Sequence, residues 1–298
     1  MRKTMVVIFA VSLLAVTACL STPDPESSPE VSAVIPELFN PVDETLVVSL
    51  SVKHPAPIDS WTIQVQPSRL GGQVAQRPEG GQGQRQTGEG QRQAGEGQRR
   101  RAPFFEQTGK GRLPRNWEWN GISSREGGEM VQSATDYRFT LTVSDKFGNT
   151  GSYEGTISVD VLVKQEGDDL RMIVPSIIFP PNSANLNSVS EEEQRSNRRV
   201  LRLIANALTK YEEYAITVEG HSNPTTPPGT TARADEEKED QVLSLQRSQA
   251  VVSFLVDNGD ISRTRMTSVG FSCTRPVADY DDEDENWKNR RVEFLLHK

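Results

Sequence analysis

Residues 215–223 read Ala-Ile-Thr-Val-Glu-Gly-His-Ser-Asn, and this stretch decides the fold of the C-terminal half. Ala215 to Glu219 is typical of a β-strand, and the Gly-His-Ser-Asn run that follows is typical of a polar turn. Leu243 to Val256 then predicts a helix, because four apolar residues recur at helical spacing and form an inward face: Ala250, Val251, Phe254 and Leu255.

The same alternation of strand and helix continues on both sides of this stretch. Upstream, a strand is predicted over Arg171 to Phe179. It is followed by a helix that opens with a capping box, Ser190 and Glu193. Downstream, strands are predicted over 265–271 and 291–296. The sequence therefore predicts an α+β domain over residues 166–298, with helices packed on a mixed sheet. The first helix should bury one stripe: Val200, Ile204, Ala207, Leu208 and Tyr211.

Three segments in order carry a family resemblance. They are Val218-Glu219-Gly220-His221-Ser222-Asn223, Leu243-Ser244-Leu245-Gln246-Arg247-Ser248-Gln249-Ala250 and Asn289-Arg290-Arg291-Val292-Glu293. Together they resemble the ordered motifs of the OmpA-like domain, a family that includes the peptidoglycan-associated lipoprotein and the flagellar stator tether. The resemblance covers about residues 168 to 298.

The resemblance implies noncovalent binding of the stem peptide of peptidoglycan. In the family, an aspartate pairs with the ammonium of the diamino acid, and an arginine of the second helix binds its carboxylate. A planar guanidinium suits a carboxylate because it can donate two parallel hydrogen bonds. Arg247 matches this arginine, Asn182 matches a polar residue of the same pocket, and Asn289 and Arg290 match the last motif.

This chain departs from the family pattern at two positions of the pocket. Asn223 stands where the family has the aspartate, and Asp240 stands where the family has an asparagine. One interpretation is that Asp240 supplies the negative charge from the opposite wall. The other is that wall binding has weakened or vanished, that Asp240 is an acid favoured at a helix start, and that the protein works through protein partners.

Two charged stretches lie outside the motifs. The segment from Pro224 to Glu239 is longer than the family loop, and it is expected to be a solvated loop, with a lid or a protein contact as the alternative. The acidic run 279–285 lacks the alternating ligands and central glycine of a calcium loop, so a flexible acidic loop is expected.

The N-terminal half has the pattern of an antiparallel β-sandwich over residues 38–165. Period-two alternation predicts strands over 45–52, 61–65, 137–143 and 156–163, with a turn at 145–149. The stretch from Pro114 to Gly121 together with 137–143 resembles Ig-like or FlgD-like sandwich repeats. Trp117 and Trp119 are expected in the core, with a binding surface as the alternative.

A glycine-rich repeat of seven residues interrupts this sandwich at about residues 71–102. No position of the repeat is consistently apolar, which excludes a coiled coil and predicts disorder. Arg99, Arg100 and Arg101 could bind an acidic partner, although a solvated loop is the simpler expectation.

The N-terminus indicates export. Residues 1–18 combine Arg2 and Lys3 with a short apolar run, as in a signal peptide. Val16-Thr17-Ala18-Cys19 resembles a lipobox, so Cys19 is the predicted lipidation site, and 19–37 is predicted to be a flexible tether. Lipid on Cys19 would anchor the protein in a membrane, and the expected location is the periplasmic face of the outer membrane.

The composition excludes several classes of function. The net charge of −8 argues against nucleic-acid binding, and two cysteines exclude a disulfide framework. His54 and His297 have no metal-ligand spacing, and His221 is expected to serve in packing or in a hydrogen bond to the backbone. No nucleophile elbow, phosphate loop or zinc-protease motif is present. The sequence therefore predicts a non-enzymatic protein without metal or cofactor, whose partners are peptidoglycan, a membrane and possible envelope proteins. With Cys19 lipidated, Cys273 is expected to be buried.

Overall fold

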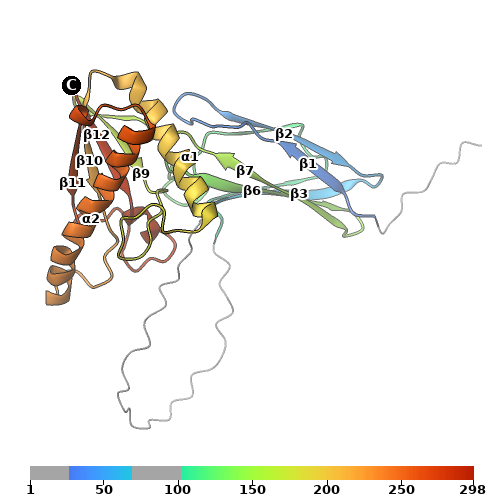
Figure 1. Cartoon of the computed structure of the whole chain (residues 1–298). Coiled ribbons are helices and arrows are strands. Elements are labelled where there is room, and N and C mark those ends of the chain that lie inside the picture. The colour runs from blue at the N-terminus through green and yellow to red at the C-terminus, as the bar shows by residue number, and fades with distance from the viewer. Residues whose placement is uncertain (1–26, 69–101) are drawn as a thin grey trace, which may run out of the picture.

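The structure, a computed structural model, describes residues 27–68 and 102–298. The predicted signal peptide, Cys19 and residues 71–101 of the glycine-rich insert lie outside the described residues. Figure 1 shows a narrow all-β arm joined to a broader α+β domain at the C-terminal end of the chain. The architecture confirms the predicted α+β fold with helices on a mixed sheet, preceded by an all-β domain.

The all-β domain consists of two antiparallel sheets. One sheet has the order β1-β2-β5, with β1 at Glu30–Val34, β2 at Leu46–Lys53 and β5 at Asn116–Trp119. The other has the order β4-β3-β6-β7, with β3 at Ile58–Pro67, β4 at Phe105–Lys110, β6 at Asp136–Asp145 and β7 at Thr150–Ser158.

The two sheets bury the apolar side chains of alternate strand positions between them. Val48, Ile63 and Phe139 are fully buried in this core. Trp117 and Trp119 are each 3% exposed and stack with ring centroids 5.8 Å apart. The expectation that both tryptophans belong to the core is therefore confirmed.

Several segments of this domain differ from the sequence-based expectation. β4 and β5 were not among the predicted strands. Glu30–Val34 lies within the predicted tether but forms β1, which pairs antiparallel with β2. The final strand starts earlier than predicted, at Thr150, and ends at Ser158. After it, Val159 makes only one bridge, to Phe39, and the chain then leaves for the second domain.

The C-terminal domain has a five-stranded sheet of order β11-β10-β12-β9-β8, in which only β10 and β11 are parallel. The strands are β8 at Lys164–Glu166, β9 at Asp169–Val174, β10 at Ala215–Gly220, β11 at Met266–Gly270 and β12 at Val292–His297. Two helices, α1 at Glu191–Leu208 and α2 at Thr231–Asn258, pack on this sheet (Figure 1).

The start of α1 was predicted correctly from the sequence, whereas the start of α2 was not. α1 begins with the predicted capping box, in which Ser190 Oγ accepts from Glu193 N and the Glu193 carboxylate accepts from Ser190 N. α2 begins at Thr231, twelve residues before the predicted start, with Thr230 as its N-cap. The expected solvated loop over 224–239 is therefore helical in its second half. Asp240 is not at a helix start.

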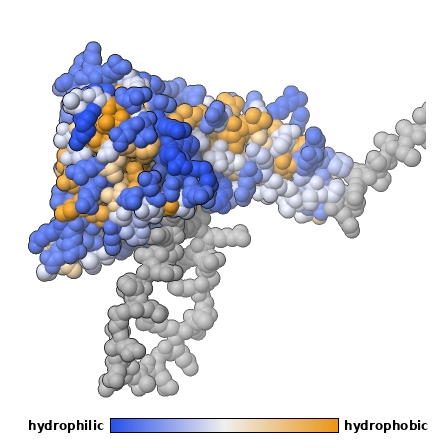
Figure 2. Space-filling view, viewed as in Figure 1, coloured by the Kyte–Doolittle hydropathy of each residue, from blue (hydrophilic) through white to orange (hydrophobic). Residues whose placement is uncertain are grey.

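The two domains share buried contacts. Ala134 and Val161 of the sandwich end belong to the apolar core of the C-terminal domain. Ser176 Oγ donates to Ala134 O at 2.8 Å, and Arg199 of α1 forms an ion pair with Asp136 of β6. Figure 2 shows the surface passing without a break from the arm to the broader domain. No helix among the described residues is long and apolar enough to cross a bilayer.

Candidate functional site

A cavity of about 1540 Å³ opens where the turn after β10, the first half of α2 and the sandwich end meet. Its walls also include residues 175–182 and the loop before β12. Of the six residues predicted from the sequence, five line this cavity: Asn182, Asn223, Asp240, Arg247 and Arg290. The sixth, Asn289, is fully buried behind one wall.

Arg247 is a buried cation that lacks a carboxylate partner among the described residues. Arg247 is 8% exposed, and its guanidinium lies over the ring of Phe179. Nε donates to Ser183 O and Nη2 to Pro180 O, both at 3.1 Å. Burial lowers the pKa of Arg247, Asp240 opposes this effect, and Arg290 adds to it. Three of its five N–H groups remain for an anion in the cavity.

Asp240 lies on the same face of α2 as Arg247, two helical turns earlier. Its Oδ2 accepts a hydrogen bond from Ser222 Oγ at 2.6 Å. This bond fixes the carboxylate beside the Gly-His-Ser-Asn turn, at the cavity wall. The site therefore presents an anion and a cation from one helix.

The amide of Asn223 is occupied by the surrounding backbone. Nδ2 donates to Pro224 O at 2.7 Å and to Tyr280 O at 3.3 Å, while Oδ1 accepts from Asn289 Nδ2 at 2.8 Å. Asn289 in turn accepts from the backbone N–H groups of Val277 and Ala278. Asn223 and Asn289 thus join the turn after β10 to the loop before β12.

Asn182 and Arg290 lie at the rim of the cavity and are exposed. Asn182 has φ +50°, a left-handed conformation that asparagine tolerates better than most residues. The carbonyls on both sides of Asn182, those of Pro180 and Ser183, accept from Arg247. The guanidinium therefore holds the bend that presents Asn182.

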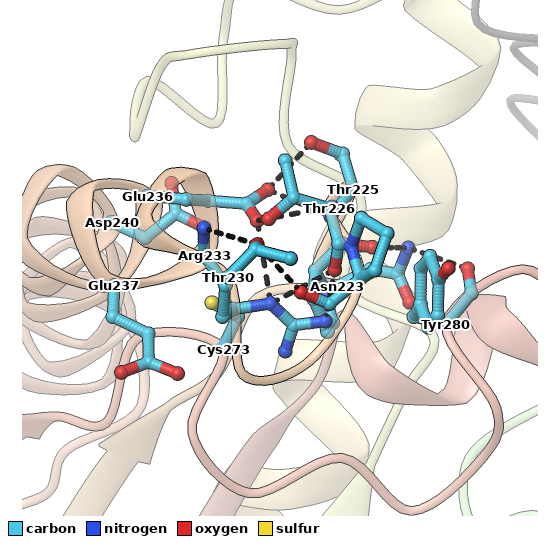
Figure 3. Close-up of polar contacts among 12 residues, drawn as sticks. Asn223, Thr225, Thr226, Thr230, Arg233, Glu236, Glu237, Asp240, Cys273 and Tyr280 are labelled. Carbon is cyan, nitrogen blue, oxygen red and sulfur yellow. Dashed lines mark hydrogen bonds and ion pairs between the residues drawn. The ribbon is translucent and has the colours of Figure 1, made fainter.

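The long segment before α2 folds back onto the helix (Figure 3). Glu236 accepts from both the backbone and the hydroxyl of Thr225 and of Thr226, at 2.6–3.2 Å. Burial raises the pKa of Glu236, but these hydrogen bonds outweigh that effect and lower the pKa. Arg233 is 7% exposed, donates to Thr226 O and lies over the ring of Tyr280. Residues 224–226 are consequently a fixed part of the cavity wall.

The motif residues Gly220 and Ser244 have a packing explanation. A Cβ on Gly220 would lie 2.1 Å from Ser244 O, so only glycine lets α2 approach β10 this closely. Ser244 is fully buried, and its Oγ accepts from Ser272 N at 2.9 Å. The close approach brings Asp240 and Arg247 to the end of the strand.

A buried ion network lies under the turn, on the sheet face away from the helices. Glu219 and Glu293 are register partners on β10 and β12, and Arg171 Nη1 donates to both. Arg291 Nε lies 2.5 Å from Glu293 Oε1. The ring of His221 stacks on Phe271, and burial lowers the pKa of His221 although Glu219 opposes this.

Glu219, His221 and Glu293 bring three ligand atoms within 4.8 Å of one another. The two carboxylates are already neutralised by Arg171 and Arg291, and these two cations oppose the entry of a metal ion. His221 is explained by ring packing, as expected from the sequence. The thiol of Cys273 is 1% exposed, which confirms its predicted burial, and burial raises its pKa.

Several residues of the site were not predicted from the sequence. Glu236 and Arg233 were assigned to a loop, although their spacing of three residues is compatible with a helix face. Asp136 and Arg199 bring the sandwich to the cavity wall, and no local pattern reveals a contact between domains. Tyr280 contributes a backbone carbonyl, which leaves no signal in the side-chain pattern.

The C-terminal part of the chain is similar to known proteins. A family model described as "OmpA family" matches residues 178–290. Outer membrane protein Omp38 of Acinetobacter baumannii is 27% identical over 125 residues, which are 42% of this chain and 30% of that protein. The chain therefore spans about a third of the length of this curated relative.

Solved structures also resemble the chain over its C-terminal part. The cell wall anchor of the T6SS from Pseudomonas aeruginosa is 29% identical, with a TM-score of 0.34, over 46% of this chain and 86% of that one. The periplasmic domain of Helicobacter pylori MotB is 18% identical, with a TM-score of 0.37, over 46% and 79%. The matched family model and the sequence motifs identify residues 178–290 as an OmpA family domain.

Proposed function

We propose that the C-terminal domain binds the stem peptide of peptidoglycan without catalysing a reaction. The observation that carries the proposal is Arg247, a buried guanidinium that faces a cavity with N–H groups to spare and has no carboxylate partner among the described residues. A buried charge without a counter-charge is costly, and a ligand carboxylate would remove that cost.

The second group of the proposed site is Asp240. The diamino acid of the stem peptide carries an ammonium and a carboxylate on one carbon atom, so a matching site needs an anion beside a cation. Asp240 and Arg247 lie on one helix face and supply this pair. Asn223 then acts in the wall, because its amide groups already bind Pro224, Tyr280 and Asn289.

At the level of the cell, the protein would tether a membrane to the wall. This step rests on the predicted signal peptide and on Cys19 as a lipid anchor, both inferred from the sequence. Omp38 is named an outer membrane protein, which is consistent with a place in the cell envelope. The periplasmic face of the outer membrane remains the proposed location.

The test is calorimetric titration of the chain without its first 19 residues. One ligand is a stem tripeptide ending in meso-diaminopimelate, and the other has lysine instead, which lacks the second carboxylate. We expect Arg247→Lys to weaken binding of the first ligand by at least tenfold, about 1.4 kcal/mol, because a bidentate contact is lost. The lysine peptide should bind both proteins equally weakly.

Matched substitutions on exposed positions serve as controls. Arg202→Lys on α1 and Asp257→Asn on α2 should leave the affinity unchanged, whereas Asp240→Asn should weaken it. Absence of saturable heat with the unmodified chain would refute stem-peptide binding and favour a role through protein partners. If Asp240→Asn binds the diaminopimelate tripeptide as tightly as the unmodified chain, Asp240 is not part of the site, although Arg247 can still be.

A further inference from the structure

The acidic run 279–285, expected to be a flexible loop, continues into a segment that contacts the β-sandwich. Arg125 Nη1 lies 2.8 Å from Glu285 Oε1. Lys288 Nζ forms ion pairs with both Glu285 and Glu129. The order Arg125, Glu285, Lys288, Glu129 is thus a chain of four alternating charges across the domain boundary.

On the sandwich side, Arg125, the first residue of this charge network, is held in place by its own domain. Arg125 also donates from Nε to Pro103 O at 3.0 Å and from Nη2 to Ala102 O at 2.6 Å. Its backbone N–H donates to Ser123 Oγ at 3.0 Å, and Ser123 Oγ donates to the backbone oxygen of Phe104. The guanidinium therefore cannot follow Glu285 without giving up bonds to its own domain.

On the side of the C-terminal domain, Glu285 and Lys288 belong to segment 277–290, which forms part of the cavity wall. The segment 277–290 contains Tyr280, Asn289 and Arg290, and two of them meet the turn after β10. Asn223 donates to Tyr280 O and accepts from Asn289 Nδ2. Arg290 N donates to Trp287 O, next to Lys288, and Arg290 lines the cavity.

The pairs that Glu285 forms with Arg125 and Lys288 differ from ordinary surface pairs, whereas the side chain of Glu129, at the end of the network, is 42% exposed. The side chains of Arg125 and Glu285 are 34% and 24% exposed, and that of Lys288 is 13% exposed. Partial burial reduces screening by salt, and a network of charges fixes geometry better than an isolated pair. The segment 277–290 has no helix longer than one short turn, Asn286–Asn289, so it depends on such contacts for its position.

We propose that the β-sandwich positions the wall of the stem-peptide cavity through Arg125 and Glu129, which hold segment 277–290. The inference rests on the proposed function for its effect on binding, but not for its effect on the segment. Arg125 and Glu129 are positioning residues, since neither is among the residues that line the cavity. The sandwich is accordingly part of the site as well as a spacer.

Hydrogen–deuterium exchange tests the positioning directly and without ligand. In Arg125→Met, which keeps the aliphatic stem, we expect backbone exchange across 277–290 to accelerate by about threefold or more. Exchange in β10 and α2 should stay unchanged. Lys53→Met, at an exposed pair with Glu30, is the control. Unchanged exchange in 277–290 at an unchanged melting temperature would overturn the proposal.

Affinity for the diaminopimelate tripeptide gives the second readout. Arg125→Met and Glu285→Gln should each weaken binding several-fold, and the effect of the double variant should be smaller than the sum of the two single effects, because both remove the Arg125–Glu285 contact. Arg125→Lys should recover part of the loss. If the unmodified chain binds and Arg125→Met binds equally well, the inference fails and the proposed function stands. Accelerated exchange without binding by any variant supports the positioning and refutes the function.

Discussion

At the scale of single residues, Asn223 shows both the reach and the limit of sequence reasoning. Its identity, and the exchange of residue types with Asp240, could be read from the motifs. Its role could not, because its three partners are a neighbouring carbonyl, a carbonyl 57 residues away and another amide 66 residues away. Five of six predicted residues line the cavity because the motif spacing reflects the strand–turn–helix geometry.

We expect Asn223→Asp to weaken stem-peptide binding and lower the melting temperature. A carboxylate cannot donate to Pro224 O and Tyr280 O, and each lost hydrogen bond costs about 1 kcal/mol. Calorimetric titration and thermal unfolding measure both effects. Asn258→Asp, at the exposed end of α2, is the matched control. Tighter binding by Asn223→Asp would instead show that residue 223 contacts the ligand ammonium.

At the scale of elements, local signals predicted what local contacts determine. The Ser190–Glu193 capping box and the apolar stripe of α1 predicted that helix because both depend on residues within a few positions. The start of α2 was missed because Asp235 to Glu239 is a charged run without apolar periodicity. The first turns of α2 are instead supported by contacts with the preceding loop, where Glu236 accepts hydrogen bonds from Thr225 and Thr226. Helical periodicity does not reveal such contacts.

The first turns of α2 should therefore be sensitive to acid. Hydrogen bonds from Thr225 and Thr226 hold the pKa of Glu236 below its ordinary 4.5. Its contribution to stability is present above pH 4.5 and is lost as the pH falls through the lowered pKa. Protection of residues 224–236 against hydrogen exchange, taken relative to the intrinsic amide exchange rate at each pH, should fall in that range. In Glu236→Gln the exchange should be faster at pH 7 and should lose this pH dependence; an identical profile would exclude Glu236 as the cause.

The contact of β10 with α2 makes a second prediction at this scale. Gly220→Ala places a Cβ 2.1 Å from Ser244 O, so the helix must shift or the strand must bend. We expect a loss of about 1–3 kcal/mol in the free energy of unfolding, measured by urea denaturation. Thr267→Ala, on the exposed side of β11, should change it far less. Equal stability of Gly220→Ala would mean that the helix adapts freely.

At the scale of the whole molecule, the docking of the two domains could not be predicted from the sequence. Ala134 and Val161 look like ordinary residues at the end of a sandwich, yet they complete the core of the other domain. Composition and alternation describe each domain separately and carry no information about which surfaces meet.

Because Ala134 and Val161 belong to the core of the C-terminal domain, we expect both domains to unfold in one calorimetric transition. Val161→Asp buries a charge at the junction and should separate the melt into two transitions, with the C-terminal domain less stable. Asp160→Asn, one residue earlier and partly exposed, tests whether a change of charge alone has this effect. Two transitions in the unmodified chain would show that the domains unfold independently despite their contact.

The pairing of β1 has a mechanical consequence. Pro29 lies against Gly151 at one end of the sandwich, whereas Asp136 and the cavity lie at the other end. The two ends are roughly 25 Å apart along β6 at the usual rise per residue. Tension between the start of the described chain and a ligand in the cavity would act along β1. Five residue pairs join β1 to β2 in antiparallel register. Such a pull would shear all of these pairs together instead of opening them one after another, which would let the arm of the proposed tether transmit force.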